Sequence, residues 1–488
     1  MLLGTNAWGF ALNVWHFLLA GLTILLSVVA SGHAVLYKRD SRAAIAWVGF
    51  IWLVPLVGAT LYFIFGINRL RRQAALLRGS LARYRAHPKQ VECTPDELHR
   101  HLPGHTGHLQ MLARVVGEVV NRPLLPGNMI EPLLNGDEAY PAMLAAIRNA
   151  KRTVSFVSYI FDHDPIGVEL AHELGEAGRR GVEVRVLIDS AGARYSFPTI
   201  FGLLRKEHVR HARFLPAFAL AMMSMNLRTH RKILVVDGEL GFTGGINIRL
   251  GHCLNRHPRR PVQDIHFRVE GPVVTQMQET FTDDWLFTTG ETLRGDAWFP
   301  TLERKGNVLA RSVVDGPDED FEKLRWTLLG ALSIARHSIR IVTPYFLPDP
   351  ALTSALNLAA LRGVVVDIVL PSKSNLSIVH WASRAGWWQM LEHGCRIWLT
   401  PPPFDHSKIM VVDGCWVSVG SANWDPRSLR LNFEFNLECY DIEFARRMEK
   451  HIEGKRASAH RVTLEEVDSR PFSSKLRDGV ARLLTPYL

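Results

Sequence analysis

Two long apolar runs near the start of the chain stand out in its hydrophobic pattern. Residues 8–30 carry no acidic or basic side chain apart from His16, and residues 43–65 carry none at all. Each run exceeds the roughly 20 apolar residues that a helix needs to cross a membrane. A cleaved signal peptide and a buried core helix are the alternatives, but the first run lacks a basic leader and the second is too uniformly apolar. We therefore predict an anchor of two transmembrane helices in residues 1–66.

Cations flank these runs unequally. The short connection between them holds Lys38, Arg39 and Arg42, whereas six arginines follow the second run between residues 69 and 85. Because positive charge accumulates on the cytoplasmic side of a membrane, the rest of the chain is expected there. Residues 67–128 are predicted to be a basic tether, with a short helix at 95–101.

From residue 129 the pattern changes to alternating helices and strands, which is typical of an α/β fold. An Arg-Gly dipeptide precedes the last strand of the series in each half of the chain. The repeated order predicts two α/β lobes, residues 129–300 and 301–488, related by a pseudo-two-fold axis. The predicted helices are 140–150, 168–179, 324–337 and 351–361, and the predicted strands are 153–161, 182–188, 338–346 and 364–370.

Three apolar stretches are candidates for contact with a membrane surface, and ordinary core packing is the alternative for each. An amphipathic helix is predicted at the end of the chain, with cations on its other faces. The stretches are the Met-rich residues 215–227, the tryptophans Trp381, Trp387 and Trp388, and the terminal stripe Phe472, Leu476, Val480, Leu483 and Leu484.

Charge and cysteine content narrow the choice of partner and compartment. The 488-residue chain has a net charge of +10 and a pI near 9.5, which favours an acidic partner, either anionic lipid or nucleic acid. Its five cysteines are scattered and form no Cys-x-x-Cys pair. The composition therefore indicates a reducing compartment, without a disulfide framework or a cysteine-based metal site.

The chemistry-bearing pattern is His-x-Lys-x4-Asp, which occurs twice, each time followed by Gly-small-x-Asn. One match would be weak, but two matches with the same sequel form a repeat. The first copy comprises His230, Lys232 and Asp237 with Gly245 and Asn247, and the second comprises His406, Lys408 and Asp413 with Ser421 and Asn423.

Apolar, mostly β-branched residues separate the Lys from the Asp in both copies, which predicts a buried strand. On a strand with a period of two, His230 and Lys232 share one face, as do His406 and Lys408. The terminal aspartates, Asp237 in the first copy and its counterpart in the second, fall on the opposite parity. We interpret both as acceptors that anchor a turn.

An imidazole beside an ammonium group suits phosphate chemistry. The lysine holds phosphoryl oxygens, the amide of Asn247 or Asn423 adds a donor, and a neutral imidazole can attack phosphorus. Two such half-sites facing each other supply one nucleophile and one general acid. A pair of core histidines is the alternative, and the duplicated Lys, Asn and Gly at fixed offsets argue against it.

The doubled motif resembles the signature of the phospholipase D superfamily. In that family each catalytic His is oriented by a carboxylate downstream of it, and the resemblance implies Asp264 and Glu434 for these roles. Each carboxylate would fix one imidazole tautomer, and a solvated surface charge is the alternative. The resemblance also implies phosphate binding and support by Asn247, Asn423, Ser421 and Gly245.

Further segments are similar to bacterial cardiolipin synthases and cover nearly the whole chain. Two segments depart from that pattern: prolines 401–403 and the His- and Arg-rich residues 249–260. Because of these departures, the resemblance does not predict the details of the pocket that binds the acceptor. The similar segments are the apolar pair with Trp47, Pro55, Gly58 and Tyr62, residues 226–232 and 241–248, the pair Asp284-Trp285, and residues 421–428.

The resemblance implies transfer of a phosphatidyl group between two phosphatidylglycerol molecules, giving cardiolipin and glycerol. His230 would attack phosphorus, and His406 would protonate the leaving alkoxide and later deprotonate the acceptor. One phosphodiester replaces another, so no cofactor or metal is expected. The implied location is the bacterial inner membrane, with the catalytic part cytoplasmic and with anionic lipids as partners.

Three other functions use similar residues. A membrane-bound phospholipase D would hydrolyse phospholipids to phosphatidic acid with the same half-sites. A nuclease of the superfamily would also be basic, but the two apolar runs and the apolar stretch before His230 argue against nucleic acid. A non-catalytic scaffold is disfavoured because both copies keep His, Lys, Asp and Asn. Oligomeric state is left open.

Overall fold

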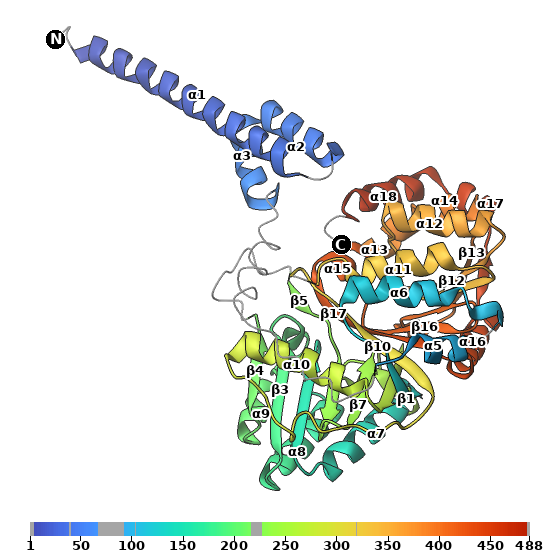
Figure 1. The fold of residues 1–488 in the computed structure, drawn as a ribbon. Helices are drawn as coiled ribbons and strands as arrows, with labels where there is room; N and C mark the ends of the chain where they lie inside the picture. Colours follow the sequence, from blue (N-terminus) through green and yellow to red (C-terminus); the bar gives the residue numbers. More distant parts are fainter. Residues whose placement is uncertain are drawn as a thin grey trace. The chain divides into compact units, whose positions relative to one another are not determined.

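The protein is described by a computed structural model that forms two compact units, Met1–Gln73 and Ala74–Leu488 (Figure 1). The structure describes residues 4–38, 41–66, 92–102, 104–215, 227–318 and 320–485. The arginine cluster between residues 69 and 85 and nearly all of the Met-rich stretch before Leu227 lie outside the described residues.

The first unit is built on one long apolar helix, α1 (Gly4–Tyr37). Its segment Val14–Tyr37 is long and apolar enough to cross a membrane. The helices α2 (Ser41–Leu53) and α3 (Pro55–Leu61) pack against it, followed by a π-helical turn, η1 (Tyr62–Gly66). A small core joins these pieces, made of Ala30, Ala34, Ile51, Ala59 and Tyr62.

The second apolar run is not a single helix, so the structure supports one spanning helix, and the second of the predicted pair stays a prediction. Val54, at φ −133° and ψ 73°, leaves the helical region, and Pro55 begins the next helix. The chain then turns back so closely that a Cβ on Gly58 would lie 2.6 Å from the carbonyl oxygen of Phe50. At about 1.5 Å per residue, α2 alone extends roughly 20 Å, short of a hydrocarbon core of about 30 Å. Among the described residues, α1 is the one helix of spanning length.

The second unit contains two α/β lobes with the same strand order, as the repeated sequence pattern predicted. In the first lobe the order is β4-β3-β2-β6-β7-β9-β1, and in the second it is β13-β12-β11-β15-β16-β17-β10, with β18 added at the far edge. The first set comprises β1 (Leu125–Leu134), β2 (Thr153–Ser158), β3 (Glu183–Asp189), β4 (His211–Phe214), β6 (Ile233–Val236), β7 (Leu240–Gly244) and β9 (Ile265–Glu270). The second set comprises β10 (Val308–Asp315), β11 (Ser338–Val342), β12 (Val365–Pro371), β13 (Arg396–Thr400), β15 (Ile409–Val412), β16 (Trp416–Gly420), β17 (Asn432–Tyr440) and β18 (His460–Val462).

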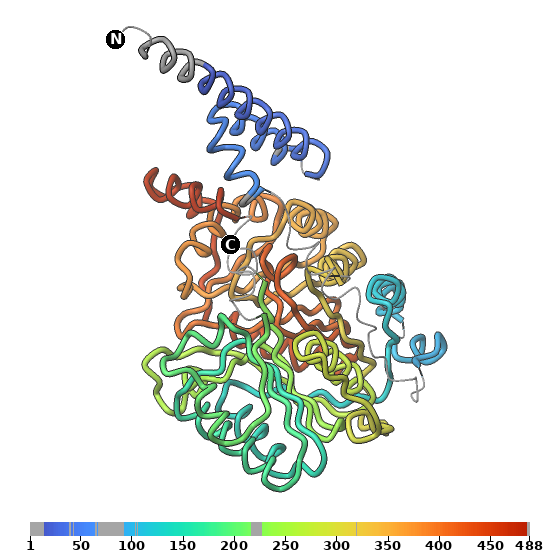
Figure 2. Tube along the Cα trace, turned by 90° about the vertical axis from the view of Figure 1, so that its left-hand side faces the viewer, coloured from blue at the N-terminus to red at the C-terminus, as the bar shows by residue number. Residues whose placement is uncertain are grey.

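The two lobes join through the antiparallel strands β1 and β10, which pair Leu125 with Ala310 and Asn128 with Val308. Within each lobe the pairing types match as well, because β2 and β3 are parallel, as are β11 and β12, while β6 and β15 each run antiparallel to their neighbours. The lobes lie side by side in both views (Figures 1 and 2).

Helices cover both faces of these sheets and enclose three apolar cores. An outer core in each lobe is covered by that lobe's helices, and a central core draws residues from both lobes, including Ile233 and Ile265 from the first and Ile409 and Phe433 from the second. The longer helices are α7 (Asn135–Asn149), α8 (Pro165–Arg179), α10 (Val274–Thr289), α11 (Lys323–Ile334), α12 (Pro350–Leu361), α13 (Ser377–Arg384), α16 (Ile442–Ala457) and α18 (Phe472–Leu483). The shorter ones are α9 (Phe201–Lys206), α14 (Trp387–Leu391), α15 (Pro426–Arg430) and α17 (Leu464–Asp468).

The end of the predicted tether is part of the globular unit. The helix α5 (Pro95–His101) coincides with the expected short helix, and the Thr94 hydroxyl caps it by accepting from the Glu97 amide. The next helix, α6 (Leu109–Val120), buries its apolar face in the core of the second lobe. In this part of the range 67–128, therefore, the chain packs as core, because α6 is strongly amphipathic and lies against α11.

Replacement of Leu112 tests this packing of α6. Leu112 is fully buried, whereas its neighbour Met111 is 65% exposed. We expect Leu112→Ala to lower the free energy of unfolding by about 2–5 kcal/mol and Met111→Ala to change it little. Thermal and denaturant unfolding of the full chain in detergent measures both variants. Equal, small effects would mean that α6 is a loosely held part of a tether.

Candidate active site

His230 and His406 each lie between a two-residue strand and the apolar strand of the motif. The two-residue strand β5 (Arg228–Thr229) precedes His230, and β14 (Phe404–Asp405) precedes His406. The buried strands β6 and β15 follow each Lys, as the apolar residues of the motif predicted. Each His-x-Lys segment therefore lies at the start of a central strand.

The two short strands pair with the opposite half of the molecule. β5 runs parallel to the start of β17, pairing Thr229 with Phe433, and β14 runs parallel to β8 (Val262–Gln263), pairing Asp405 with Gln263. The next hydrogen bond along each pair comes from the histidine itself. The His230 amide donates to the Phe433 carbonyl (2.9 Å) and the His406 amide donates to the Gln263 carbonyl (2.8 Å).

This backbone pairing places each imidazole beside the carboxylate that follows the accepting carbonyl. His230 Nδ1 lies 3.0 Å from Glu434 Oε2, and His406 Nδ1 lies 2.8 Å from Asp264 Oδ2. The sequence analysis expected each histidine to be oriented by a carboxylate downstream in its own copy. The structure corrects that expectation, since each histidine is paired with the carboxylate of the other copy.

The two pairs are not identical. Glu434 is fully buried and also accepts from the Ser421 hydroxyl (2.5 Å) and the Asn432 amide (3.0 Å). Asp264 accepts from the backbone amide of Ile265 (2.8 Å). At the position equivalent to Ser421 stands Gly245, where a Cβ would lie only 2.2 Å from Asp264 Oδ1. The first copy thus uses glycine where the second uses a hydroxyl donor.

The acidities of the two carboxylates diverge for this reason. Burial opposes ionisation of Glu434, but His230, Lys232 and the Ser421 hydroxyl together bring its pKa below the usual value. Burial raises the pKa of Asp264 to about 6, although Lys408 acts in the opposite direction. Glu434 is therefore the more firmly ionised of the two acceptors at neutral pH.

Both imidazoles are held in a form suited to nucleophilic or base chemistry. Burial lowers the pKa of His230, and Glu434 opposes that effect. The pKa of His406 is lowered further, by burial and by the nearby charges of Lys408, Lys232 and His230. Because Nδ1–H donates to a carboxylate in each pair, Nε2 carries the lone pair and faces the substrate side.

The two lysines of the motif are buried beside the histidines. Lys232 Nζ donates to the backbone carbonyl of His230 (2.6 Å) and Lys408 Nζ to that of His406 (2.5 Å). Burial lowers the pKa of Lys232 to about 7 and that of Lys408 to about 8. An anionic phosphodiester would offset the free-energy cost of burying two ammonium groups, because its negative charge attracts both of them.

The asparagines flank the same site. Asn247 accepts from the Ile160 amide through Oδ1 (3.2 Å), and Asn423 donates to the Ser428 hydroxyl (3.2 Å). Both are 5% exposed, and Asn423 Oδ1 has no hydrogen-bond partner among the described residues. Asn423 Oδ1 is therefore an acceptor that stays open for a ligand.

The motif aspartates lie at the far end of their strands. Asp237 accepts from the backbone amides of Arg152 and Thr153, and Asp413 accepts from those of His337 and Ser338. These bonds hold the turn that precedes β2 or β11. They agree with a turn-anchoring role, and in the part of the chain that the structure describes neither aspartate forms a hydrogen bond to His230 or His406.

Sequence reasoning missed the residue between His and Lys. Arg231 is fully buried and donates to Asp284 Oδ1 (2.6 Å) and to the carbonyls of Glu434 (3.1 Å) and Asp315 (3.1 Å). It thereby ties the first motif to the second lobe. The Asp284-Trp285 pair, noted only as a similarity, was the available signal.

Aromatic rings line the approach to the histidines and were also missed. The Tyr159 ring meets His230 edge-on at 5.2 Å between centroids, and Phe404 and Tyr345 lie 6.0 and 6.4 Å from His406. Only 11% of each histidine side chain is exposed. Over the part of the chain that the structure describes, no three His, Cys, Asp or Glu side chains are placed to hold a metal ion.

Comparison with known proteins agrees with this geometry. A family model described as "Cardiolipin synthase, PLD-like domain" matches residues 143–285 and 328–456, and one described as "Phospholipase_D-nuclease N-terminal" matches residues 25–66. The "Cardiolipin synthase" of Geobacillus kaustophilus is 31% identical over 98% of this chain and 95% of its own. The "Cardiolipin synthase A" of Pseudomonas fluorescens strain SBW25 is 33% identical over 95% of this chain and 96% of its own.

Solved structures support the fold. The chain resembles the phosphatidylserine synthase of Haemophilus influenzae Rd KW20 with a TM-score of 0.60 and 15% identity, over 78% of this chain and 100% of that one. The doubled motif, the two-lobe fold and relatives of full length point to one family. The chain belongs to the cardiolipin synthases, phosphatidyltransferases of the phospholipase D superfamily.

Proposed function

We propose that this enzyme transfers a phosphatidyl group from one phosphatidylglycerol to the glycerol hydroxyl of another, through a covalent intermediate on His230. The observation that carries the proposal is the convergence of two carboxylate-paired imidazoles and two buried lysines from opposite halves of the chain. One centre of this kind supplies a nucleophile, a proton donor and a phosphate clamp together.

The phosphodiester occupies the space over the two lysines. Lys232 and Lys408 neutralise its non-bridging oxygens, and the amide nitrogen of Asn247 adds a neutral donor. Each lysine is already oriented by the carbonyl of its own histidine. Little reorganisation is then needed as negative charge builds up in the pentavalent transition state.

In the first step a P–N bond forms and a P–O bond breaks. The Nε2 lone pair of His230 attacks phosphorus. His406 takes up a proton once the anionic phosphodiester offsets the positive charges around it, and gives that proton to the departing glycerol oxygen. In the second step His406 removes the proton from the hydroxyl of an incoming phosphatidylglycerol. That oxygen attacks phosphorus, the P–N bond breaks, and cardiolipin leaves with His230 restored.

The unequal carboxylates support this division of roles. A phosphatidyl-imidazole that keeps its Nδ1–H is cationic, and the ionised Glu434, held by Ser421 and Asn432, is the stronger partner for a lasting positive charge. His406 must gain and lose a proton in each cycle. Its partner Asp264 has a pKa raised to about 6 and so stabilises the imidazolium less.

The environment of the site favours a lipid acceptor over water. The histidine side chains are mostly covered, and aromatic rings line their approach. Water has less access to the covalent intermediate under these conditions.

The helix α1 anchors the chain in the bacterial inner membrane, with the second unit on the cytoplasmic side, and a further crossing by residues 43–65 stays a prediction.

Histidine variants test the covalent mechanism. With labelled phosphatidylglycerol in liposomes, His230→Ala and His406→Ala should form no cardiolipin, while His172→Ala, on the exposed face of α8, should match the parent. A phosphatidyl ester of nitrophenol has a leaving group that needs no protonation. With this substrate, His406→Ala should still form the covalent intermediate, so the labelled phosphatidyl group should be found on the peptide that contains His230. Label on the His406 peptide of His230→Ala would reverse the two roles. Phosphatidic acid as the product of the parent enzyme would contradict the synthase mechanism.

Neutral replacements of the lysines test the phosphate clamp. Lys232→Met and Lys408→Met keep most of the side-chain volume and remove the charge. We expect each to lower kcat/KM by about 10²- to 10³-fold, the effect of losing one preorganised donor. Rates within a few-fold of the parent would show that these lysines act only in packing.

The pH dependence of kcat/KM tests the same groups in the free enzyme. On the alkaline side it should fall as Lys232 and Lys408, with pKa values of about 7 and 8, lose their protons and stop binding the anion. On the acidic side it should fall below about pH 6, as Asp264 takes up a proton and ceases to accept from His406. Lys232→Arg, which stays charged, should move the alkaline limb to higher pH. An alkaline limb that is unchanged in this variant would exclude Lys232 as its cause.

A further inference from the structure

The helix α18 is amphipathic, but its apolar face points away from the protein. Its stripe Phe472, Leu476, Val480 and Leu483 faces outward, with exposed fractions of 79%, 56%, 54% and 76%. A helix on the surface of a soluble domain normally buries such a stripe. On α18 the apolar side chains are the exposed ones.

The inward face of α18 is polar and small. Asp478 is fully buried and pairs with Arg470 (2.8 Å) and Arg477 (2.7 Å). One turn further on, Ala481 packs against Leu347 and against Val379 and Ala382 of α13. These contacts hold the helix in one orientation, so its apolar stripe is presented by a fixed element.

The neighbouring helix extends the apolar surface. α13 packs along α18, and Ile378, in its first turn, is 37% exposed, next to Leu376 at 46%. The guanidinium group of Arg477 lies 4.6 Å from the centre of the Trp381 ring. A stacked Arg–Trp pair at the edge of an apolar patch is typical of the interfacial zone of a membrane, where both side chains contact head groups.

The charge on α18 indicates which surface would cover it. The helix carries Lys475, Arg477 and Arg482 against one acid, Asp478, which is consumed by its internal ion pairs. Cations beside an exposed apolar stripe are the pattern of a helix that lies in the plane of an anionic bilayer. The substrates of this family are themselves membrane phospholipids, and the same chain holds a helix of spanning length.

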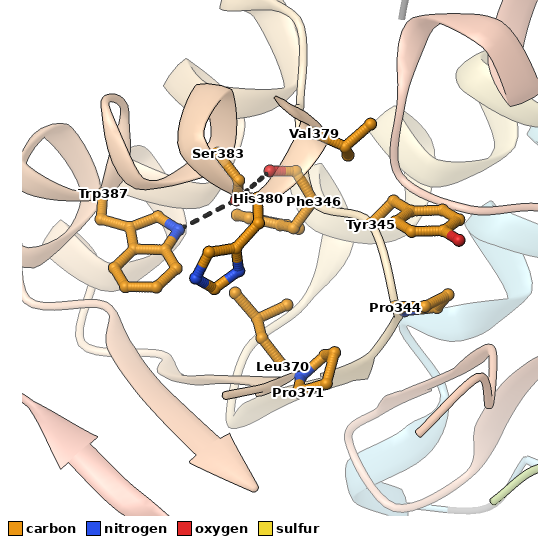
Figure 3. Close-up of a pocket in the computed structure, with 9 residues that line it drawn as sticks. All are labelled: Pro344, Tyr345, Phe346, Leu370, Pro371, Val379, His380, Ser383 and Trp387. Atoms are coloured by element: carbon orange, nitrogen blue, oxygen red, sulfur yellow. Dashed lines mark hydrogen bonds between the residues drawn. The ribbon is translucent and has the colours of Figure 1, made fainter. Parts of the chain in front are cut away.

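A pocket lies beside α13, the helix against which α18 packs (Figure 3). Val379 of α13, which contacts Ala481, also lines the pocket, together with His380, Trp387 and Tyr345. Ser383 holds its wall by donating to the Phe346 carbonyl (2.6 Å) and accepting from the Trp387 indole (3.0 Å). The ring of Tyr345 reaches the imidazole of His406. The same pocket is therefore lined by Val379, which supports α18, and by Tyr345, which lies next to His406.

We propose that α18, together with the start of α13, docks the second lobe on the surface of an anionic phospholipid bilayer. This contact is additional to the anchor in the first unit. It brings the side of the second lobe that holds Tyr345 and the neighbouring pocket close to the lipid surface. The inference goes beyond phosphatidyl transfer, because it specifies which face of the catalytic unit meets the lipid.

The test measures the depth of a single fluorescent label in liposomes that hold the full chain. Cys93 is replaced by Ser, since the other four cysteines are buried, and Val480→Cys is labelled with an environment-sensitive dye. Glu443→Cys, on the exposed face of α16, is the matched control. In liposomes rich in phosphatidylglycerol, we expect a blue shift and strong quenching by brominated acyl chains at position 480, because an interfacial helix sits about 5–10 Å below the head-group boundary. Position 443 should show neither effect.

Other outcomes overturn the proposal. An unshifted, unquenched label at position 480 would mean that α18 stays in water. A blue shift without quenching by brominated lipid would mean that protein, such as a second copy of this chain, covers the stripe. Equal quenching at both positions would mean that the lobe adsorbs without a preferred face. Cardiolipin formation is measured in the same liposomes, so failure of docking and failure of phosphatidyl transfer are distinguished.

Discussion

The crossed pairing of histidine and carboxylate is the interaction on which the rest of the structure depends. His230 binds Glu434 and His406 binds Asp264, so neither copy of the motif holds a complete orienting pair by itself. The short parallel strands β5 and β14 enforce the crossing, because β5 pairs with β17, which contains Glu434, and β14 pairs with β8, which ends one residue before Asp264. Buried charges of this kind are stable only when both partners are in place, which ties the relative position of the lobes to the electrostatics of the site. Arg231 adds a third link, from the first motif to backbone carbonyls of the second lobe.

A pseudo-symmetric frame of this kind can still assign different tasks to its halves. The lysines and asparagines stand at equivalent positions in both copies of the motif. The carboxylates differ: one is a glutamate with a hydroxyl and an amide donor, and the other is an aspartate packed against Gly245. The pKa values of the carboxylates move apart as a result, with Asp264 near 6 and Glu434 below its usual value. Divergent acidity in a symmetric site is a common physical basis for separating a nucleophile from an acid–base catalyst.

Local patterns predicted local structure well. The helix predicted at 95–101 was found at the expected residues, and the strands predicted from 153 and 338 begin at Thr153 and Ser338. What failed depends on contacts distant in sequence. The crossed carboxylates are 204 and 142 residues from their histidines, so no spacing rule revealed the pairing. The core position of α6 depends on its contact with α11. The break at Val54, by contrast, is local, and Pro55 was visible in the sequence.

The most direct test of the crossed site is proton NMR of the imidazole Nδ1–H resonances, which move far downfield when the proton is shared with a buried carboxylate. Selective histidine labelling, with one histidine replaced at a time, assigns the two signals. Glu434→Gln should shift the His230 resonance and leave that of His406 in place, and Asp264→Asn should do the reverse. A shift of the His406 signal in Glu434→Gln, with His230 unaffected, would show that each histidine pairs within its own copy of the motif and would contradict the account.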